Sequence, residues 1–420
     1  MAIWRRRGVL AGAVAALVLA GALGGAFALR ADRATATASQ AGPEGVPASE
    51  PPRVVEALPL LKARLDANPN AFMGAVLVAR GDQILFRQVY GMADIQNAVP
   101  LRVGSRFRLA SISKQFTAAA ILKLQDEGRL KTGDKVCAWI QPCPEAWADL
   151  TIAHLISHTS GIPDVMQRPG WGLRRVTPTN LTELTEDSKF YPLRSIPGEK
   201  LAYNNAGFNL AADIVERASG VPYADYLKAT FFLPLGMTDT GLGDTPDDGK
   251  PIVVGYANLR EGLIPQNRPN VSVVEGAGAL YSTLDDVLKW QRALHGGKLL
   301  SAAAYAEMTA NHAPPVRPDE TRNPDRHWGY GLFIMPLGTE VEPAFTDRQI
   351  YHTGSWSGFR NLATYQPDSD VTVIVLSNSY YQREEVLLIT QQAMAEVVGR
   401  PIPERLKPRE PAGAVPAGAR

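Results

Sequence analysis

Hydrophobic and polar positions follow two different periods along the chain. Near the start, residues 74–80 and 83–90 are rich in β-branched and aromatic side chains, and Gly81-Asp82 between them is typical of a hairpin turn. Elsewhere apolar residues recur at the i, i+3, i+4 spacing that places them on one face of a helix. This spacing predicts helices over residues 54–65, 111–130, 205–219 and 283–294.

Two of these helices carry sequence signals at their ends. The 205–219 helix stops at Gly220, which favours the left-handed turn that ends many helices. The 283–294 helix begins after Ser282, with Asp285 in the position of a capping box, and ends at Gly296-Gly297.

Strand patterns return only in the last part of the chain. They cover residues 329–335, 349–353, 359–366 and 371–378, and a helical pattern over residues 384–398 follows. Strands at both ends with helices between them predict an α+β fold, an α/β sandwich. We expect one antiparallel sheet built from both chain ends and flanked by helices, with a mainly helical region inserted. The expected domain spans residues 54–400, with its α/β part at 54–110 and 325–400 and its helical insertion at 111–324.

The two ends of the chain differ from this domain in composition. Three consecutive arginines precede an uncharged apolar run over residues 8–29, and Ala26-Phe27-Ala28 has the small-x-small pattern that a signal peptidase cuts after. We therefore expect residues 1–28 to be a signal peptide and the protein to be exported, periplasmic or secreted. The alternative is an uncleaved membrane anchor, because the run is just long enough to span a bilayer. Residues 29–53 and 401–420 have the composition of a disordered linker and a disordered tail.

Charge and cysteine content narrow the class of protein. The 420 residues include 43 Lys and Arg against 42 Asp and Glu, a net charge of +1, whereas a nucleic-acid binder usually carries a basic excess. We expect no nucleic-acid partner. Only 2 cysteines, Cys137 and Cys143, are present, which excludes a disulfide-rich scaffold and a thiolate zinc cluster. In an oxidising compartment they suit one small disulfide loop, and two free buried thiols are the alternative.

Signals for a cofactor or a metal are missing from the sequence. It contains no Gly-x-Gly-x-x-Gly fingerprint and no Walker loop, so we expect no nucleotide cofactor. It also lacks the Gly-x-Ser-x-Gly of α/β-hydrolases. His154 and His158 lie four apart on a predicted helix face, as zinc ligands do, but Leu155 stands where a zincin has its glutamate. We expect both histidines to make structural hydrogen bonds, and no metal site.

A Ser-x-x-Lys motif begins the predicted 111–130 helix. Ser111 and Lys114 share one helix face, so the hydroxyl and the amine can touch. A serine hydroxyl is a weak nucleophile that needs an adjacent base. The positive end of the helix dipole and partial desolvation both lower the pKa of a lysine, which would let Lys114 accept the serine proton. Taken alone, however, the motif is more typical of a helix cap beside a solvated lysine.

Two further motifs have the same chemical character. Tyr203 and Asn205 lie where the chain enters the predicted 205–219 helix. A tyrosine near two cations can ionise and move a proton, while an asparagine amide can donate to a substrate carbonyl. The third motif is His352, Thr353, Gly354 and Ser355, at the end of a predicted strand. There a cationic or hydrogen-bonding side chain and a backbone N–H can flank a substrate.

In this order, the motifs resemble those of the penicillin-recognising serine hydrolases, a family that includes class C β-lactamases, DD-carboxypeptidases, D-aminopeptidases and β-lactamase-like esterases. Residues 150–163, which contain His-Thr-Ser-Gly, and the Gly-rich residues 276–283 look like further segments of that family. The resemblance covers about residues 54–398. It implies a β-lactamase/transpeptidase-like fold and a catalytic domain.

The resemblance also implies roles for individual residues. Ser111 attacks an amide, ester or β-lactam carbonyl, Lys114 and Tyr203 move protons, and the backbone N–H groups of Ser111 and Ser355 form an oxyanion hole. Asn205 and the four residues from His352 to Ser355 bind the substrate, a small molecule or peptide. Many β-lactamases have lysine where this chain has His352, so a peptidase or esterase is the expected activity. The alternatives are a β-lactamase proper, or a penicillin-binding sensor or pseudoenzyme that acylates without turnover.

Two other segments match parts of these motifs by chance. Lys131-Thr132-Gly133 is a literal Lys-Thr-Gly, but it lies in a loop just after the first long helix and before Tyr203. Tyr256 begins a second Tyr-x-Asn that lacks the Pro-Gly lead-in and the following helix. Three aromatic residues fit either a pocket wall or the core: Trp328, Tyr330 and Trp356.

Overall fold

A computed structural model describes residues 57–259, 262–266, 270–316 and 327–407. The predicted signal peptide and linker, together with residues 408–420 of the predicted tail, lie outside these ranges. Among the described residues, no helix combines the length and the hydropathy needed to span a membrane.

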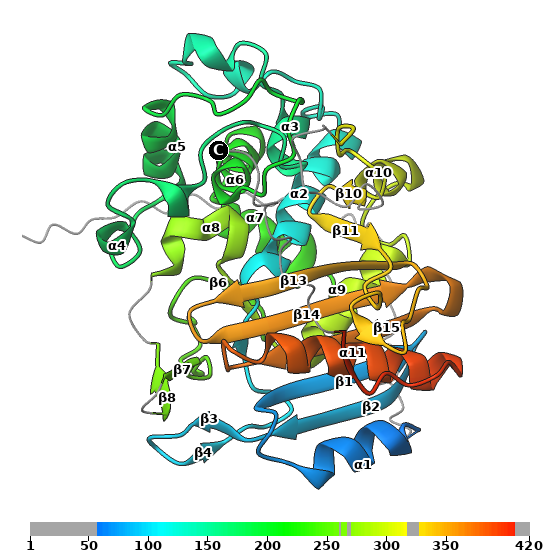
Figure 1. The fold of residues 1–420 in the computed structure, drawn as a ribbon. Helices are drawn as coiled ribbons and strands as arrows, with labels where there is room; N and C mark the ends of the chain where they lie inside the picture. Colours follow the sequence, from blue (N-terminus) through cyan, green and yellow to red (C-terminus); the bar gives the residue numbers. More distant parts are fainter. Residues whose placement is uncertain (1–56, 260–261, 267–269, 317–326, 408–420) are drawn as a thin grey trace, which may run out of the picture. The chain divides into compact units, whose positions relative to one another are not determined.

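An antiparallel sheet unites the beginning and the end of the described chain (Figure 1). Its seven strands run in the order β10-β11-β13-β14-β15-β1-β2. They are β1 (Gly74–Arg80), β2 (Gln83–Tyr90), β10 (His327–Gly329), β11 (Leu332–Met335), β13 (Gln349–Trp356), β14 (Phe359–Gln366) and β15 (Val371–Ser377). Strand β1 pairs with β15 over its whole length, from Gly74 opposite Ser377 to Arg80 opposite Val371. The predicted α+β architecture, with one sheet made from both chain ends, is confirmed.

Alternate side chains of the central strands face two different cores. Val373 and Val375 of β15 pack with helices α1 (Pro59–Ala67) and α11 (Arg383–Val398). Ile374 and Leu376, which alternate with these valines along the strand, pack with α2 (Lys114–Asp126) and α9 (Leu284–His295). Helices therefore cover both faces of the sheet, which explains why β1 and β15 read as nearly continuous apolar runs (Figure 1).

The inserted region between β2 and β10 is mainly helical. Its other α-helices are α3 (Ile152–Ile156), α4 (Trp171–Arg174), α5 (Leu181–Lys189), α6 (Asn205–Ser219), α7 (Tyr223–Leu227), α8 (Glu275–Gly278) and α10 (Ala302–Met308). Its 3₁₀ turns are η1 (Ala110–Ser113), η2 (Val136–Ala138), η3 (Glu145–Trp147), η4 (Val165–Gln167) and η6 (Val271–Val274), and η5 (Lys228–Phe232) is a π turn. A further 3₁₀ turn, η7 (Pro367–Ser369), joins β14 to β15.

Short strands complete the described structure. The pairs are β3 (Met92–Asp94) with β4 (Val99–Pro100), β7 (Tyr256–Leu259) with β8 (Gly262–Pro265), and β12 (Val341–Glu342) with β16 (Arg405–Leu406). Three more form a small sheet in the order β5 (Phe107–Arg108), β9 (Leu280–Ser282), β6 (Gly241–Leu242).

Several predicted boundaries were wrong, for local reasons. Helix α1 starts only at Pro59, since a proline suits the first turn of a helix. Ser111 lies in η1 rather than in the following α-helix, which ends at Asp126, two residues before Gly128. The predicted 329–335 strand is two strands joined by a turn at Gly331, which has a φ of 64°.

The cap of α9 also differs from the prediction. The side chain of Thr283, not Ser282, accepts a hydrogen bond from the backbone N–H of Asp286, so the capping pair is shifted by one residue. The hydroxyl of Ser282 instead shares a hydrogen bond with that of Thr240, at 2.7 Å.

The start of the predicted disordered tail is ordered in the structure. Strand β16 pairs with β12, with Leu406 opposite Val341, and Ile402 packs against the core on the α11 face of the sheet. The tail prediction rested on proline content, which does not reveal such edge pairing. Elsewhere, Cys137 and Cys143 form a disulfide with their Cα atoms 5.3 Å apart, the first of the two alternatives.

Candidate active site

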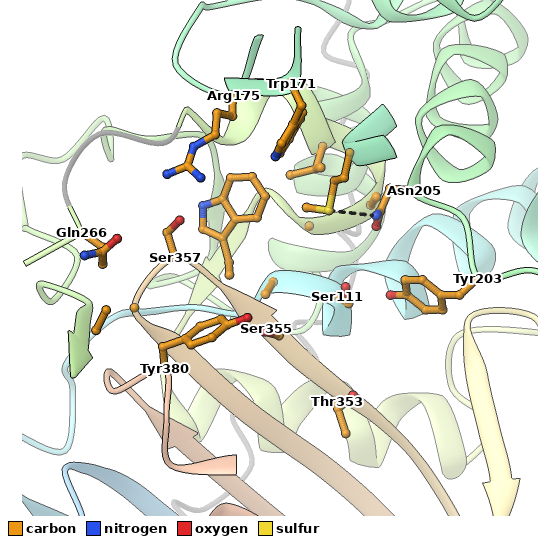
Figure 2. Close-up of a pocket in the computed structure, with 18 of the residues that line it drawn as sticks. Ser111, Trp171, Arg175, Tyr203, Asn205, Gln266, Thr353, Ser355, Ser357 and Tyr380 are labelled. Atoms are coloured by element: carbon orange, nitrogen blue, oxygen red, sulfur yellow. Dashed lines mark hydrogen bonds between the residues drawn. The ribbon is translucent and has the colours of Figure 1, made fainter. Parts of the chain in front are cut away.

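A cavity of about 650 Å³ lies where the helical insertion meets the edge of β13 (Figure 2). Turn η1, the segment from η4 to α4, the start of α6, helix α8 and the β13–β14 turn all contribute to its wall. The lining residues include all three motifs of the sequence: Ser111 from the first, Tyr203 and Asn205 from the second, and Thr353 and Ser355 from the third.

Ser111 is held close to β13 by the two residues before it. Ala110, the residue before it, adopts a φ of 51°, a strained conformation for a residue other than glycine. Gly354 of β13 approaches so closely that a Cβ there would lie 2.2 Å from the carbonyl oxygen of Leu109. Only glycine fits this contact, so the glycine of the third motif sets how near the strand can come to the serine.

Lys114 is fully buried beside Ser111. Its Nζ lies 3.1 Å from Ser111 Oγ, 2.8 Å from Asn205 Oδ1 and 2.9 Å from the carbonyl oxygen of Ala277. A neutral amine has two N–H bonds and one lone pair. The amide and carbonyl oxygens can only accept, so they take the two N–H bonds, and the lone pair is left for the Ser111 hydroxyl.

Burial favours that neutral amine. It lowers the pKa of Lys114 to about 7, although the carboxylate of Asp164 opposes the shift. A substantial fraction of Lys114 is therefore unprotonated near neutral pH. The expected contact between the Ser-x-x-Lys side chains, and the lowered pKa of the lysine, are both present in the structure.

The hydroxyl of Tyr203 points at Ser111 (Figure 2). Lys114 Nζ lies 4.8 Å from the centroid of the Tyr203 ring. Burial nevertheless raises the pKa of the Tyr203 phenol, and a hydrogen bond with Ser111 opposes this only in part. The expectation of a readily ionised tyrosine was wrong: it needed two cations beside the ring, and desolvation of the phenol dominates instead.

His158 fixes Tyr203 in place. The carbonyl of His158 accepts a hydrogen bond from Ala202 N at 2.9 Å, and its Nδ1 accepts one from Asn204 N at 3.0 Å. Its ring also stacks on the Tyr203 ring, with the centroids 4.4 Å apart. The structural role expected for this histidine is confirmed. It does not share a helix with His154, because α3 ends at Ile156 and His158 has a φ of 63°.

Asn205 connects Lys114 to a buried carboxylate. Asp164 Oδ2 accepts hydrogen bonds from Asn205 N at 2.5 Å and from Asn205 Nδ2 at 3.0 Å, while Oδ1 accepts one from Met166 N at 2.8 Å. Asn205 Oδ1 accepts from Lys114. Asn205 Nδ2 also donates to Met166 Sδ, at 3.6 Å (Figure 2). A thioether sulfur is a weak acceptor, so a substrate carbonyl would take this N–H by displacing the contact with Met166.

The third motif divides between the pocket and the core. Thr353 and Ser355 line the pocket, but His352 is only 2% exposed and is not among the described lining residues. His352 Nδ1 donates to the Thr353 carbonyl oxygen at 2.6 Å. Burial and the nearby Lys114 lower the pKa of His352 to about 3, so the ring is neutral. The expectation that the His352 side chain faces the substrate was wrong.

The side chains of the two chance matches have structural partners, although Ala257, next to Tyr256, lines the pocket. Thr132 follows α2 and donates its hydroxyl to Glu307, at 2.7 Å. Tyr256 is buried, and its hydroxyl accepts a hydrogen bond from Ile95 N, at 2.8 Å. His154 Nδ1 accepts from Thr151 N, at 3.3 Å. No three His, Cys, Asp or Glu side chains in the described ranges are grouped to hold a metal ion.

Sequence reasoning missed part of the pocket. The unforeseen lining residues include Met166, Trp171, Arg175, Gln266 and Tyr380. Trp356, which the sequence left open between pocket and core, also lines the pocket. Trp328 and Tyr330 are buried outside this lining. Sequence reasoning also missed Asp164. Its position directly after the 150–163 segment was the one signal in the sequence that could have pointed to it.

The fold and this pocket together define a class: the serine β-lactamases and penicillin-binding proteins, with an antiparallel sheet from both chain ends and three motifs meeting where a helical insertion joins it. A family model described as "Beta-lactamase" matches residues 64–395. The chain belongs to the Beta-lactamase family.

Individual relatives agree with this assignment. Penicillin-binding protein 4* of Bacillus subtilis (strain 168) is 30% identical over 355 residues, covering 80% of this chain and 75% of that protein. Esterase EstB of Burkholderia gladioli is 28% identical over 366 residues, covering 77% of this chain and 91% of that protein. The structure of an octameric penicillin-binding protein homologue from Pyrococcus abyssi matches with a TM-score of 0.67 at 25% identity, covering 81% of this chain and 77% of that one.

Proposed function

We propose that this protein is an exported serine hydrolase that acts through a Ser111 acyl-enzyme on amide or ester carbonyls. The observation that carries the proposal is the set of three Lys114 contacts. Two fixed acceptors hold the N–H bonds of a buried amine, which leaves its lone pair for the Ser111 hydroxyl. An adjacent base of this kind is what makes a serine nucleophilic.

Acylation begins when Ser111 Oγ attacks the substrate carbonyl and Lys114 takes the hydroxyl proton. The backbone N–H groups of Ser111 and Ser355 stabilise the oxyanion, a contribution of about 3 kcal/mol for each donor in comparable sites. The neutral Tyr203 phenol then passes a proton to the leaving group and regains one from Lys114, which returns to the neutral amine. Asn205 Nδ2 donates to the acyl portion of the substrate.

Deacylation uses the same groups in reverse. A water molecule takes the place of the leaving group and attacks the ester of Ser111. Because the pKa of Tyr203 is raised, this phenol acts as a relay. The water proton passes through the phenol to Lys114, and Ser111 Oγ recovers its proton when it leaves.

Peptidase or esterase chemistry suits this site better than efficient β-lactam hydrolysis. A permanent cation in the third motif would anchor the carboxylate of a β-lactam, and His352 is buried and neutral here. The relative named as an esterase, matched over 91% of its length, supports the same choice.

Export is proposed from the N-terminal arginines and apolar run, with the Cys137–Cys143 disulfide as support, since such bonds persist in oxidising compartments. The proposed partners are small-molecule or peptide substrates and no nucleic acid. A membrane is a partner only if the N-terminal segment is retained.

A substrate panel tests this function. Turnover of p-nitrophenyl acetate, a D-Ala-D-Ala peptide and nitrocefin is measured for the wild-type protein, for Ser111→Ala and for Ser113→Ala. Ser113 is a matched serine on the same turn that does not line the pocket. We expect turnover of the ester or the peptide that Ser111→Ala abolishes and Ser113→Ala retains.

Two outcomes would contradict the proposal. Turnover that is equal in wild type and Ser111→Ala would mean that another group does the chemistry. A stable adduct of fluorescent penicillin on Ser111, with no turnover of any substrate, would identify a sensor that acylates without release.

A further inference from the structure

Arg175 is the only positively charged side chain among the described residues that line the pocket, and none of those residues carries a carboxylate. The half-buried guanidinium extends into the cavity beside Trp171 (Figure 2). It makes no ion pair with any described residue, whereas its neighbour Arg174 pairs with Asp187 at 2.8 Å. An unpaired arginine facing a cavity is a binding site for an anion, because its fork of donors matches a carboxylate.

The backbone of Arg175 is fixed, so the position of this charge is defined. Arg175 N donates to the carbonyl of Trp171 at 2.9 Å, and its own carbonyl accepts a hydrogen bond from Asn270 N at 2.8 Å. The segment is therefore tied both to α4 and to the stretch before η6.

Besides Tyr203, four aromatic side chains line the same pocket, and Trp171 lies beside Arg175 (Figure 2). The four are Trp171, Trp356, Tyr380 and Tyr381. Flat apolar walls favour an apolar or aromatic body in the ligand, and a cavity of about 650 Å³ is large enough to hold one. The ligand that fits has an apolar body and an anionic end.

The arrangement around Ser111 shows which half of a substrate reaches Arg175. In Figure 2, Trp171 and Arg175 lie on one side of Ser111, and Tyr203 and Thr353 lie on the other. In the proposed mechanism Tyr203 protonates the leaving group, so the leaving group occupies the Tyr203 side. The acyl half of the substrate then extends toward Trp171 and Arg175.

We propose that Arg175 selects substrates whose acyl half ends in a carboxylate: amides or esters of an apolar dicarboxylic acid, or peptides with an acidic group on the acyl side. This inference rests on the proposed hydrolase function. His352, the other candidate for binding an anion, is buried and neutral, so charge selectivity in the described pocket depends on Arg175.

Paired chromogenic esters measure this selectivity. Mono-p-nitrophenyl adipate and suberate are compared with the neutral p-nitrophenyl methyl esters of the same acids, at low ionic strength and after subtraction of the spontaneous rates. For at least one chain length, wild-type kcat/KM should favour the anionic ester by about tenfold or more, the effect of one charge-assisted pair. Added salt should reduce this preference.

Variants assign the preference to one side chain. Arg175→Gln should bring the ratio close to one while turnover of the neutral ester persists, and Arg175→Lys should retain part of the preference. Arg175→Glu should reverse it, in favour of a p-nitrophenyl ester with a terminal ammonium group. The matched control is Arg174→Gln, which changes the neighbouring arginine outside the pocket lining and should keep the wild-type ratio.

The outcomes separate this inference from the function it rests on. If Ser111-dependent turnover is found but wild type shows no preference, or if Arg175→Gln keeps the preference, the Arg175 inference is overturned and the hydrolase stands. If no ester is hydrolysed in a Ser111-dependent way, both are overturned.

Discussion

Lys114 shows how burial turns an ordinary side chain into a base. Three oxygen atoms within about 3 Å fix the direction of its lone pair, and removal from water lowers its pKa to about 7. Two histidines, His158 and His352, interact electrostatically with Lys114. Both have lowered pKa values and stay neutral. Lys114 is thus the group whose titration near neutral pH should control acylation.

The pH dependence of activity follows with a definite sign. Only the unprotonated amine can accept the Ser111 proton, so kcat/KM for a neutral ester should rise with pH and level off above about 7. The profile is measured between pH 5 and pH 9, together with that of His352→Asn. The rising limb should be present in both, and its disappearance in His352→Asn would mean that the histidine is the titrating base.

Gly354 sets the distance between β13 and the nucleophile. In Gly354→Ala, the new Cβ would meet the Leu109 carbonyl at 2.2 Å, so the strand must move away from η1. A displacement of about 1 Å at such a site lowers kcat/KM by about 100-fold. The matched control is Gly104→Ala, where a Cβ meets nothing within 4 Å. Equal activity of the two variants would show that this close approach is unimportant.

At the level of elements, Asp164 joins the loop after α3 to the first residue of α6. It accepts from both nitrogen atoms of Asn205, at 2.5 Å and 3.0 Å, and its charge raises the pKa of Lys114. The loop thus positions the second motif and adjusts the basicity of the lysine at the same time.

Removing this charge should move the pH profile in a known direction. In Asp164→Asn the carboxylate no longer favours the protonated amine, so the rising limb of kcat/KM should shift to lower pH than in wild type. The pH profile of kcat/KM is measured with the same neutral ester, and a thermal unfolding transition checks that the variant is folded. A limb that stays in place or moves to higher pH would contradict the proposed coupling of Asp164 to Lys114.

The elements themselves were largely readable from the sequence. The bounds of β1, β2, β14 and α6 agree with their predicted ranges, because alternation or helical spacing continues to a glycine or a turn residue at each end. Helix α1 begins later than predicted, at Pro59, because proline suits the first turn of a helix. Helix α9 shifted by one residue, since its cap depends on which of two adjacent hydroxyls meets a backbone N–H.

The parts of the site that escaped prediction depend on contacts between distant segments. Asp164 and Asn205 are 41 residues apart, and no periodicity connects them. Whether His352 points into the pocket or the core depends on packing around β13. Arg175 follows a helix of four residues, which is too short to carry a pattern. The motif residues could be found because their chemistry is local: Ser111 and Lys114 are adjacent on one turn.

At the scale of the whole molecule, the last described residues, 401–407, pack against the α11 face of the sheet and do not line the pocket. Strand β16 pairs with β12, and Gln392 of α11 donates to the carbonyl of Pro403 at 2.7 Å. No residue after Tyr381 is among the described lining residues of the cavity.

Shortening the chain tests this separation of stability from catalysis. A chain ending at Arg400 loses β16 and the packing of Ile402, and its free energy of unfolding should fall by about 1–3 kcal/mol with kcat/KM unchanged. A chain ending at Lys407 keeps both and serves as the control. Denaturant unfolding and ester turnover are measured on the same samples. A loss of kcat/KM in the shorter chain would link this edge to the site.

The central claim is that Ser111 carries the acyl group, and the most direct measurement is the mass of the trapped intermediate. The protein is mixed with an activated ester or a penicillin, quenched in acid within milliseconds to seconds, digested and analysed by mass spectrometry. The expected result is an acyl adduct on the peptide that contains Ser111, absent from Ser111→Ala and forming faster above pH 7 than below it. An adduct on any other residue, or turnover that continues in Ser111→Ala, would contradict the account.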